Sequence, residues 1–312
     1  MLNLITVILP IFGMMLIGFL AVALKLLDKT QLGALGAFVI KVALPSILLV
    51  NISAQEWANV WQPQYLISYA VVSLVMFIAL LWLYRYQFNT PLHQSAVFAM
   101  GGSMSNTGFI GGATLHLILG PAAAVYFAMT FIVENFIVFL LFLVCLEMHG
   151  KSQSNVFKTV STTIKSIFKN PIIIALCISV MMCLFQIQLP PIAKSILEPI
   201  GKATGPLGLF VIGGSLYGVK AFQHLSKDTV IITLSKMVIM PVLVYCVLSN
   251  MPNVSQEMLF AGVLLAGISM VTMFGIFGQQ TGIAEQTSTT LLLCTLGNLI
   301  VVTTTMALLL PK

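Results

Sequence analysis

Hydrogen-bonding side chains gather in a glycine-rich stretch at residues 99–112, inside an otherwise apolar segment. The stretch holds five glycines and the polar residues Ser103, Ser105, Asn106 and Thr107. Glycine is the weakest ordinary helix former, so a helix that crosses a membrane is expected to break here. Broken backbone at membrane depth is tolerated only where it is buried in protein or lines a cavity. This stretch is therefore the first candidate for a binding site.

A broken helix exposes backbone N–H groups at the start of its second half, where the helix dipole also favours negative charge. The side chains of Asn106 and Thr107 add further hydrogen-bonding groups. We predict that Ser103, Ser105, Asn106 and Thr107 belong to a substrate site for a small anion. The alternative interpretation is that small residues at these positions allow helices to pack closely.

A second stretch, residues 269–278, carries a similar but less polar pattern. Broken helices in corresponding halves of a chain indicate the binding site of a secondary transporter. We predict that Thr272 and Met273 contribute to the same site. Packing is the alternative role for the methionine and phenylalanine side chains of this stretch.

Glu134 lies deep inside an apolar segment. An ionisable group at membrane depth is costly and is a functional hypothesis by default. We predict that Glu134 is a proton-coupling residue; the alternative is a structural pair with Lys236. Asn135 and Asn298 are expected to occupy matching places, either holding unwound backbone or contacting the substrate.

The composition is that of a protein that crosses a membrane several times. The 312 residues are 59% hydrophobic and 7% charged, whereas soluble domains carry about 25% charged residues. The net charge of +6 comes mostly from basic residues in predicted loops, where they set membrane topology, so no nucleic-acid partner is expected. The five cysteines show no metal-type spacing, and no metal site, cofactor or enzymatic signature is predicted.

Ten apolar segments are long enough to cross a bilayer, which takes about 20 residues. The fold class predicted is an all-α membrane protein whose fourth and ninth helices are broken. The expected spans are 3–24, 33–53, 64–84, 93–117, 121–146, 168–188, 193–218, 229–249, 256–279 and 284–310.

The distribution of basic residues predicts the orientation. Nine lysines and arginines fall in loops on one side and three on the other, so the richer side is expected to be cytoplasmic. Both termini are then extracytoplasmic. The basic cytoplasmic loop 151–167 separates two five-helix halves, 1–150 and 168–312.

The two halves show matching residues. Three pairs are separated by 161 positions: Pro10 and Pro171, Lys41 and Lys202, Pro45 and Pro206. Because each half has an odd number of spans, the second half must be inverted in the membrane, as in many secondary transporters.

The sequence at 106–111, Asn-Thr-Gly-Phe-Ile-Gly, resembles the fourth-helix crossover motif of the auxin efflux carrier family. That family includes plant auxin exporters and bacterial malonate-type permeases. The stretches 43–49, 205–216 and 273–276, with Glu134 and Asn135, are similar to other parts of the bacterial branch. The resemblance covers the whole chain. This sequence departs from the family in having Met104 or Ser105, Ala113 and Met270 where relatives often carry proline.

The resemblance implies a fold similar to bile-acid symporters and sodium–proton antiporters. Spans 1, 2, 6 and 7 would form a scaffold and a homodimer contact, and spans 3–5 and 8–10 a mobile transport domain. The implied function is transport of a small organic anion, such as malonate or an auxin-like carboxylate, with possible proton coupling, across the cell (inner) membrane. Membrane lipid is the expected surrounding partner. A channel or a sensor built on the same broken-helix fold is the alternative.

Overall fold

In the computed structural model, the described residues are 2–148, 161, 165, 168–215, 217 and 225–310. They form helices throughout, and the β-type pairing described among them is one isolated antiparallel bridge between Ser105 and Met270. The all-helical character predicted from the sequence is therefore confirmed. The predicted loop 151–167 lies, apart from Ser161 and Lys165, outside the described residues.

Five helical runs within this part of the chain are long and apolar enough to cross a membrane. They are Thr30–Ser53, Pro63–Gln87, Gly112–Leu146, Lys227–Ser249 and Ala284–Leu309. Three further apolar helical stretches of 10–17 residues lie at Gly13–Ala23, which is the second half of the longer helix α1, at Pro171–Leu184 and at Gln256–Gly267. These bounds differ in places from the predicted ten spans.

The predicted span 193–218 is one such case. It consists of α12 (Pro191–Lys202) and α13 (Thr204–Ser215), two helices that are separated at Ala203. Pro206 lies in the first turn of α13, where a missing backbone N–H costs little because no partner is needed there.

The chain forms two compact units. Unit 1 contains residues 1–63, 107–129 and 168–219, and unit 2 contains residues 64–106, 130–167 and 220–312. The second half of the predicted fourth span thus belongs to unit 1, whereas the prediction assigned all of spans 3–5 to one transport domain. The functional division into scaffold and transport domain stays a prediction.

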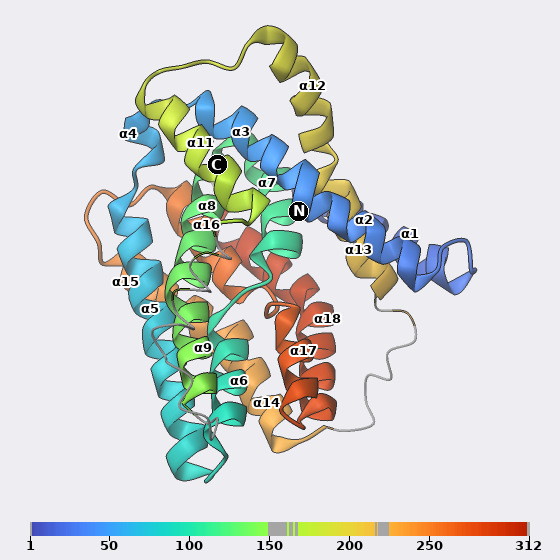
Figure 1. Ribbon diagram of the computed structural model, residues 1–312, viewed down its shortest axis with the longest axis vertical. Coiled ribbons are helices and arrows are strands. Elements are labelled where there is room, and N and C mark those ends of the chain that lie inside the picture. The colour runs from blue at the N-terminus through green and yellow to red at the C-terminus, as the bar shows by residue number, and fades with distance from the viewer. Residues whose placement is uncertain are drawn as a thin grey trace. The chain divides into compact units, whose positions relative to one another are not determined.

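Unit 1 is built around the close approach of α1 (Leu2–Ala23) and α13 (Figure 1). A Cβ atom added at Gly213 would collide with the backbone carbonyl of Met15, and one at Gly18 with that of Phe210. Glycine at these positions therefore lets the two backbones touch. The other helices of the unit are α2 (Lys29–Phe38), α3 (Leu44–Ser53), α4 (Trp57–Val60), α7 (Gly112–Leu119), the first part of α8 (Ala123–Val133), α11 (Pro171–Leu184) and α12.

Unit 2 contains the two broken segments and the helices that support them. Helices α6 and α17 pack on each other, and so do α16 and α18. The bounds of its helices are α5 (Pro63–Trp82), α6 (Leu92–Ser103), α9 (Phe139–Glu147), α14 (Lys227–Leu234), α15 (Met240–Ser249), α16 (Gln256–Gly267), α17 (Met273–Gln280) and α18 (Ala284–Leu309).

Two buried charged residues of unit 2 lie in π-helical turns. Glu134 begins the turn Glu134–Val138, and Lys236 is the second residue of the turn Ser235–Ile239. A π turn inserts an extra residue into the helix and is frequent at functional sites. Both side chains are almost fully buried, at 2% and 0% exposure.

Candidate functional site

Two helices end abruptly inside unit 2. Helix α6 ends at Ser103 and is followed by extended Met104, and α16 ends at Gly267 and is followed by extended Ile268. The extended segments 104–106 and 268–271, which we call the crossing, lie side by side. Ser105 forms the antiparallel bridge with Met270, and the Asn106 backbone N–H donates to the Ser269 carbonyl at 2.7 Å.

Backbone pairing explains how both helices can be broken here without the prolines that are common in the family this sequence resembles. Helix ends leave backbone N–H and C=O groups unbonded, and such groups cannot remain unpaired inside a membrane. At the crossing the two extended segments supply backbone hydrogen-bond partners for each other, as neighbouring strands of an antiparallel sheet do. Both segments that the sequence predicted to be broken are thus interrupted in the structure.

Asn106 is the predicted site residue most directly at the crossing. It is 7% exposed, and its Nδ2 donates to Thr272 Oγ1 at 3.3 Å. Thr272 immediately precedes α17, and both Thr272 and Met273 are exposed. Asn106 and Thr272, predicted separately from two distant stretches, are therefore brought together beside the N-terminus of α17.

Ser105 is the centre of a buried hydrogen-bond network. Its backbone N–H donates to Glu134 Oε1 at 2.8 Å, and its hydroxyl donates to the Leu265 carbonyl at 2.6 Å. The Lys236 ammonium donates to the same hydroxyl at 2.6 Å. The Tyr69 hydroxyl lies 3.3 Å from Ser105 Oγ and donates to Glu134 Oε1 at 3.4 Å. Ser105 thus joins four helical segments.

The network holds opposite charges. Glu134 and Lys236 interact electrostatically, and both bond to Ser105. Lys236 Nζ also lies 3.2 Å from the Met240 sulfur. A charge in a low-dielectric interior is tolerated when it is paired and hydrogen-bonded, so each residue makes the other's burial possible.

Each extended segment is held by an anchor, by which we mean the buried side chain that accepts the backbone N–H of its serine. Glu134 is the anchor of Ser105, and the second segment has its own. The Ser269 backbone N–H donates to Asn298 Oδ1 at 2.8 Å, and Asn298 Nδ2 donates to Ser269 Oγ at 3.3 Å. Ser105 and Glu134 are 29 residues apart, as are Ser269 and Asn298. The residue that matches Asn298 is therefore Glu134. The predicted match between Asn135 and Asn298 is wrong, because the sequence comparison misplaced the register by one residue.

The other predicted site residues make local contacts. Ser103 donates to the Ala99 carbonyl at 2.6 Å, and Asn135 Nδ2 donates to the Phe131 carbonyl at 2.8 Å, each four residues back in its own helix. Thr107 belongs to unit 1, where it is 1% exposed and its hydroxyl has no hydrogen-bond partner among the described residues.

Sequence reasoning missed Tyr69 and gave Lys236 only as an alternative partner. Tyr69 is fully buried and stacks on Tyr65, whose hydroxyl lies 2.7 Å from Thr130 Oγ1. The available signal was the pair of tyrosines four residues apart inside an apolar helix. Such spacing places both side chains on one helix face.

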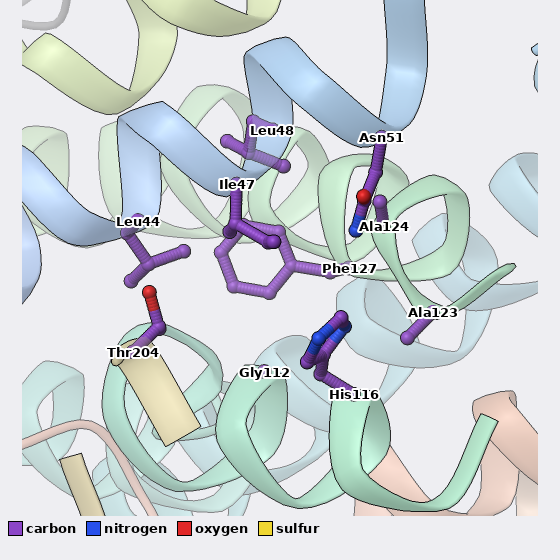
Figure 2. Close-up of a pocket in the computed structure, with 10 residues that line it drawn as sticks. All are labelled: Leu44, Ile47, Leu48, Asn51, Gly112, His116, Ala123, Ala124, Phe127 and Thr204. Atoms are coloured by element: carbon purple, nitrogen blue, oxygen red, sulfur yellow. The ribbon is translucent and has the colours of Figure 1, made fainter. Parts of the chain in front are cut away.

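Unit 1 contains a small cavity of about 20 Å³, shown in Figure 2. Asn51 of α3 and Thr204 at the start of α13 line it, and neither Asn51 Nδ2 nor Thr204 Oγ1 has a hydrogen-bond partner among the described residues. The remaining lining is apolar apart from His116 and includes the ring of Phe127. A cavity of this size holds no more than about one water molecule, so it is too small for an organic anion.

Fold and site together define a helical membrane protein that is organised around two broken, paired helices. Comparison with known proteins agrees with this class. The family described as membrane transport protein matches residues 3–308. The chain therefore belongs to that family, and the predicted relationship to the auxin efflux carriers is confirmed. It is a multi-pass protein of membrane transport.

Two curated relatives extend over most of the chain. A protein of Rhizobium meliloti (strain 1021) named "Putative malonate transporter" is 24% identical over 297 residues, covering 95% of this chain and 92% of its own. A protein of Escherichia coli (strain K12) named "Uncharacterized transporter YfdV" is 25% identical over 292 residues, covering 89% and 90%. Both relatives are named as transporters, which supports a transport role for this chain and not an enzymatic one.

Proposed function

We propose that this protein is a secondary transporter that moves a small organic anion, such as malonate or another carboxylate, by alternating access at the crossing. The observation that carries the proposal is the meeting of Asn106 with Thr272 beside the N-terminus of α17. The relative named for malonate supports the choice of substrate class.

We assign the substrate to Asn106, Thr272 and Met273 of unit 2, and a role for Thr107 stays a prediction. The N-terminus of α17 supplies backbone N–H groups and the positive end of a helix dipole, which suit a carboxylate. The Asn106–Thr272 hydrogen bond of 3.3 Å is long, so a carboxylate oxygen can replace it at little cost. The remaining residues predicted for binding are assigned to support of this site: Ser103, Ser105, Asn135 and Asn298.

Glu134 is the proposed proton-coupling residue. As a carboxylate it accepts the Ser105 N–H and lies near Lys236. A protonated carboxyl has an O–H donor that the carboxylate lacks. Protonation of Glu134 would therefore neutralise the carboxylate that balances the charge of Lys236. It would also change the hydrogen bonds that hold Ser105. That change is the proposed link between proton binding and movement.

The proposed architecture is two inverted five-helix repeats forming ten spans. Helices α6 and α16 have the same length of 12 residues, which supports a repeat. The contacts of Ser105 with Glu134 and of Ser269 with Asn298 support it further. Spans 1, 2, 6 and 7 are proposed as the scaffold and homodimer contact, and spans 3–5 and 8–10 as the transport domain. We place the protein in the cell (inner) membrane with both termini outside.

Binding at the crossing is tested by thermal unfolding of the purified protein with malonate, other carboxylates and indole-3-acetate. A ligand of the folded state adds RT ln(1 + [L]/Kd), about 2.7 kcal/mol at 100 Kd. Asn106→Ala should remove the stabilisation by malonate. Asn250→Ala is the control, because Asn250 is exposed and bonds to Cys246 in its own helix. Equal stabilisation of both variants would place the ligand elsewhere.

Transport is tested by counterflow of malonate into proteoliposomes. Saturable counterflow that requires malonate on the opposite side indicates a carrier, whereas a channel allows no such exchange. Glu134→Gln combined with Lys236→Met, which leaves no unpaired buried charge, should retain counterflow and lose acceleration by a proton gradient. Counterflow with unchanged gradient dependence would refute the role of Glu134 in coupling while leaving the carrier function in place.

A further inference from the structure

Two serines hold matching places at the crossing. The backbone N–H of Ser105 is bound by Glu134, and that of Ser269 by Asn298, each at 2.8 Å and each by a residue 29 positions later. All four residues are buried, with exposures of 0–2%. The two anchors therefore do the same task for the backbone with different side chains.

The two anchors differ in how the hydroxyl of each serine receives a hydrogen bond. The Asn298 amide serves Ser269 twice, because its oxygen accepts the backbone N–H and its nitrogen donates to the hydroxyl at 3.3 Å. An ionised carboxylate only accepts hydrogen bonds. Glu134 therefore has nothing to donate to Ser105 Oγ, and Lys236 supplies that donor at 2.6 Å.

We propose that Glu134 and Lys236 together do at Ser105 what Asn298 does alone at Ser269. Lys236 is then a positioning residue. It donates the hydrogen bond to Ser105 Oγ that the Glu134 carboxylate cannot donate, and it balances the charge of Glu134. The Ser105 hydroxyl is left with its own proton for the Leu265 carbonyl near the end of α16. The pair thereby connects both broken segments.

The arrangement has a chemical consequence. An amide at position 134 has the acceptor and the donor that Asn298 has, so it makes Lys236 dispensable. A charged lysine without its carboxylate is costly, as is a carboxylate without its lysine. Removal of both charges with an amide at 134 should therefore restore what removal of Lys236 alone destroys.

The experiment measures thermal unfolding of purified variants. Lys236→Met should lower the Tm by roughly 5–15 °C, because it removes the positive charge that balances the buried Glu134 carboxylate. Lys227→Met is the control for loss of a lysine, because Lys227 is exposed at the start of the same membrane-spanning run. Its Nζ lies 4.2 Å from the centroid of the Phe88 ring, and such a contact at an exposed site contributes only weakly to stability. The Tm of this control should remain close to that of the unsubstituted protein.

Rescue separates hydrogen bonding from charge balance. Glu134→Gln combined with Lys236→Met should recover most of the lost Tm, whereas Glu134→Ala combined with Lys236→Met should not. Equal rescue by glutamine and alanine would show that only charge matters and would overturn the proposal. A double variant with glutamine no more stable than Lys236→Met would overturn it as well.

A reciprocal substitution tests the second anchor. Asn298→Asp places a carboxylate beside Ser269, whose hydroxyl has no bond from a lysine in the described part of the chain, and it should lower the Tm by a similar amount. An unchanged Tm would contradict the equivalence of the two anchors. The role of the pair in transport rests on the proposed function, but these measurements need no substrate. They can therefore fail or succeed independently of malonate binding and counterflow.

Discussion

Asn298→Leu is predicted to weaken the whole crossing, and its magnitude follows from the contacts of one side chain. Asn298 makes two hydrogen bonds to Ser269, and both residues are almost fully buried. Leucine has a similar size but leaves the Ser269 N–H without its acceptor. An unsatisfied buried donor costs about 1–3 kcal/mol, and a typical hydrogen bond contributes about 1 kcal/mol. The expected loss is therefore about 3 kcal/mol of unfolding free energy.

Thermal unfolding in detergent measures this loss. For chains of this size, 1 kcal/mol corresponds to about 2–4 °C, so the Tm should fall by roughly 10 °C. Thr304→Val, an exposed substitution in the same helix α18, is the control and should change the Tm by no more than about 2 °C. A Tm for Asn298→Leu equal to that of the control would refute the assignment of Asn298 as the anchor of the second segment.

Three further substitutions test other parts of the structure by the same measurement. Gly213→Ala should destabilise unit 1 by about 1–3 kcal/mol, because its methyl group would collide with the backbone of Met15, whereas Gly33→Ala, in open space, should not. Thr204→Val should leave the Tm unchanged or raised, because the buried hydroxyl has no partner among the described residues; a clear fall would contradict this. Tyr69→Phe should cost no more than about 1 kcal/mol, because its hydrogen bonds are long, at 3.3 and 3.4 Å; a larger loss would show that the hydroxyl is essential.

The sequence predicted the positions of the breaks well. Five glycines and a cluster of small polar residues weaken the helix at 99–112. At 269–278 the reasoning was weaker, because Gly275 and Gly278 lie inside α17 and the break falls just before them, at 268–271. The sequence also drew attention to Glu134, because an ionisable side chain is costly at membrane depth and is retained there mainly for function. These features are local, so composition and spacing were enough.

The hydrogen-bond partners that Ser105 finds on distant helices of unit 2 could not be predicted in the same way. Ser105 contacts Leu265 and Lys236, which are 160 and 131 residues away. Such contacts depend on how helices pack in three dimensions. The predicted pairing of Asn135 with Asn298 failed for a related reason. Proline and lysine pairs at a separation of 161 reported on the first helices of each half, whereas Glu134 and Asn298 differ in type and share only their contacts.

The crossing contains short buried bonds and one longer bond between partly accessible side chains. Bonds of 2.6–2.8 Å connect Ser105 with Glu134, Lys236 and Leu265, and all these groups are buried. Asn106 is tied by its backbone N–H at 2.7 Å but by its side chain only at 3.3 Å, to an exposed threonine. Under the proposed function, a substrate carboxylate would take over the Asn106 amide without loosening the backbone. The backbone N–H groups of Ser105 and Asn106 keep their own short bonds when the Asn106 side chain changes partner. Under the proposed function, binding and release therefore need not unfold the crossing.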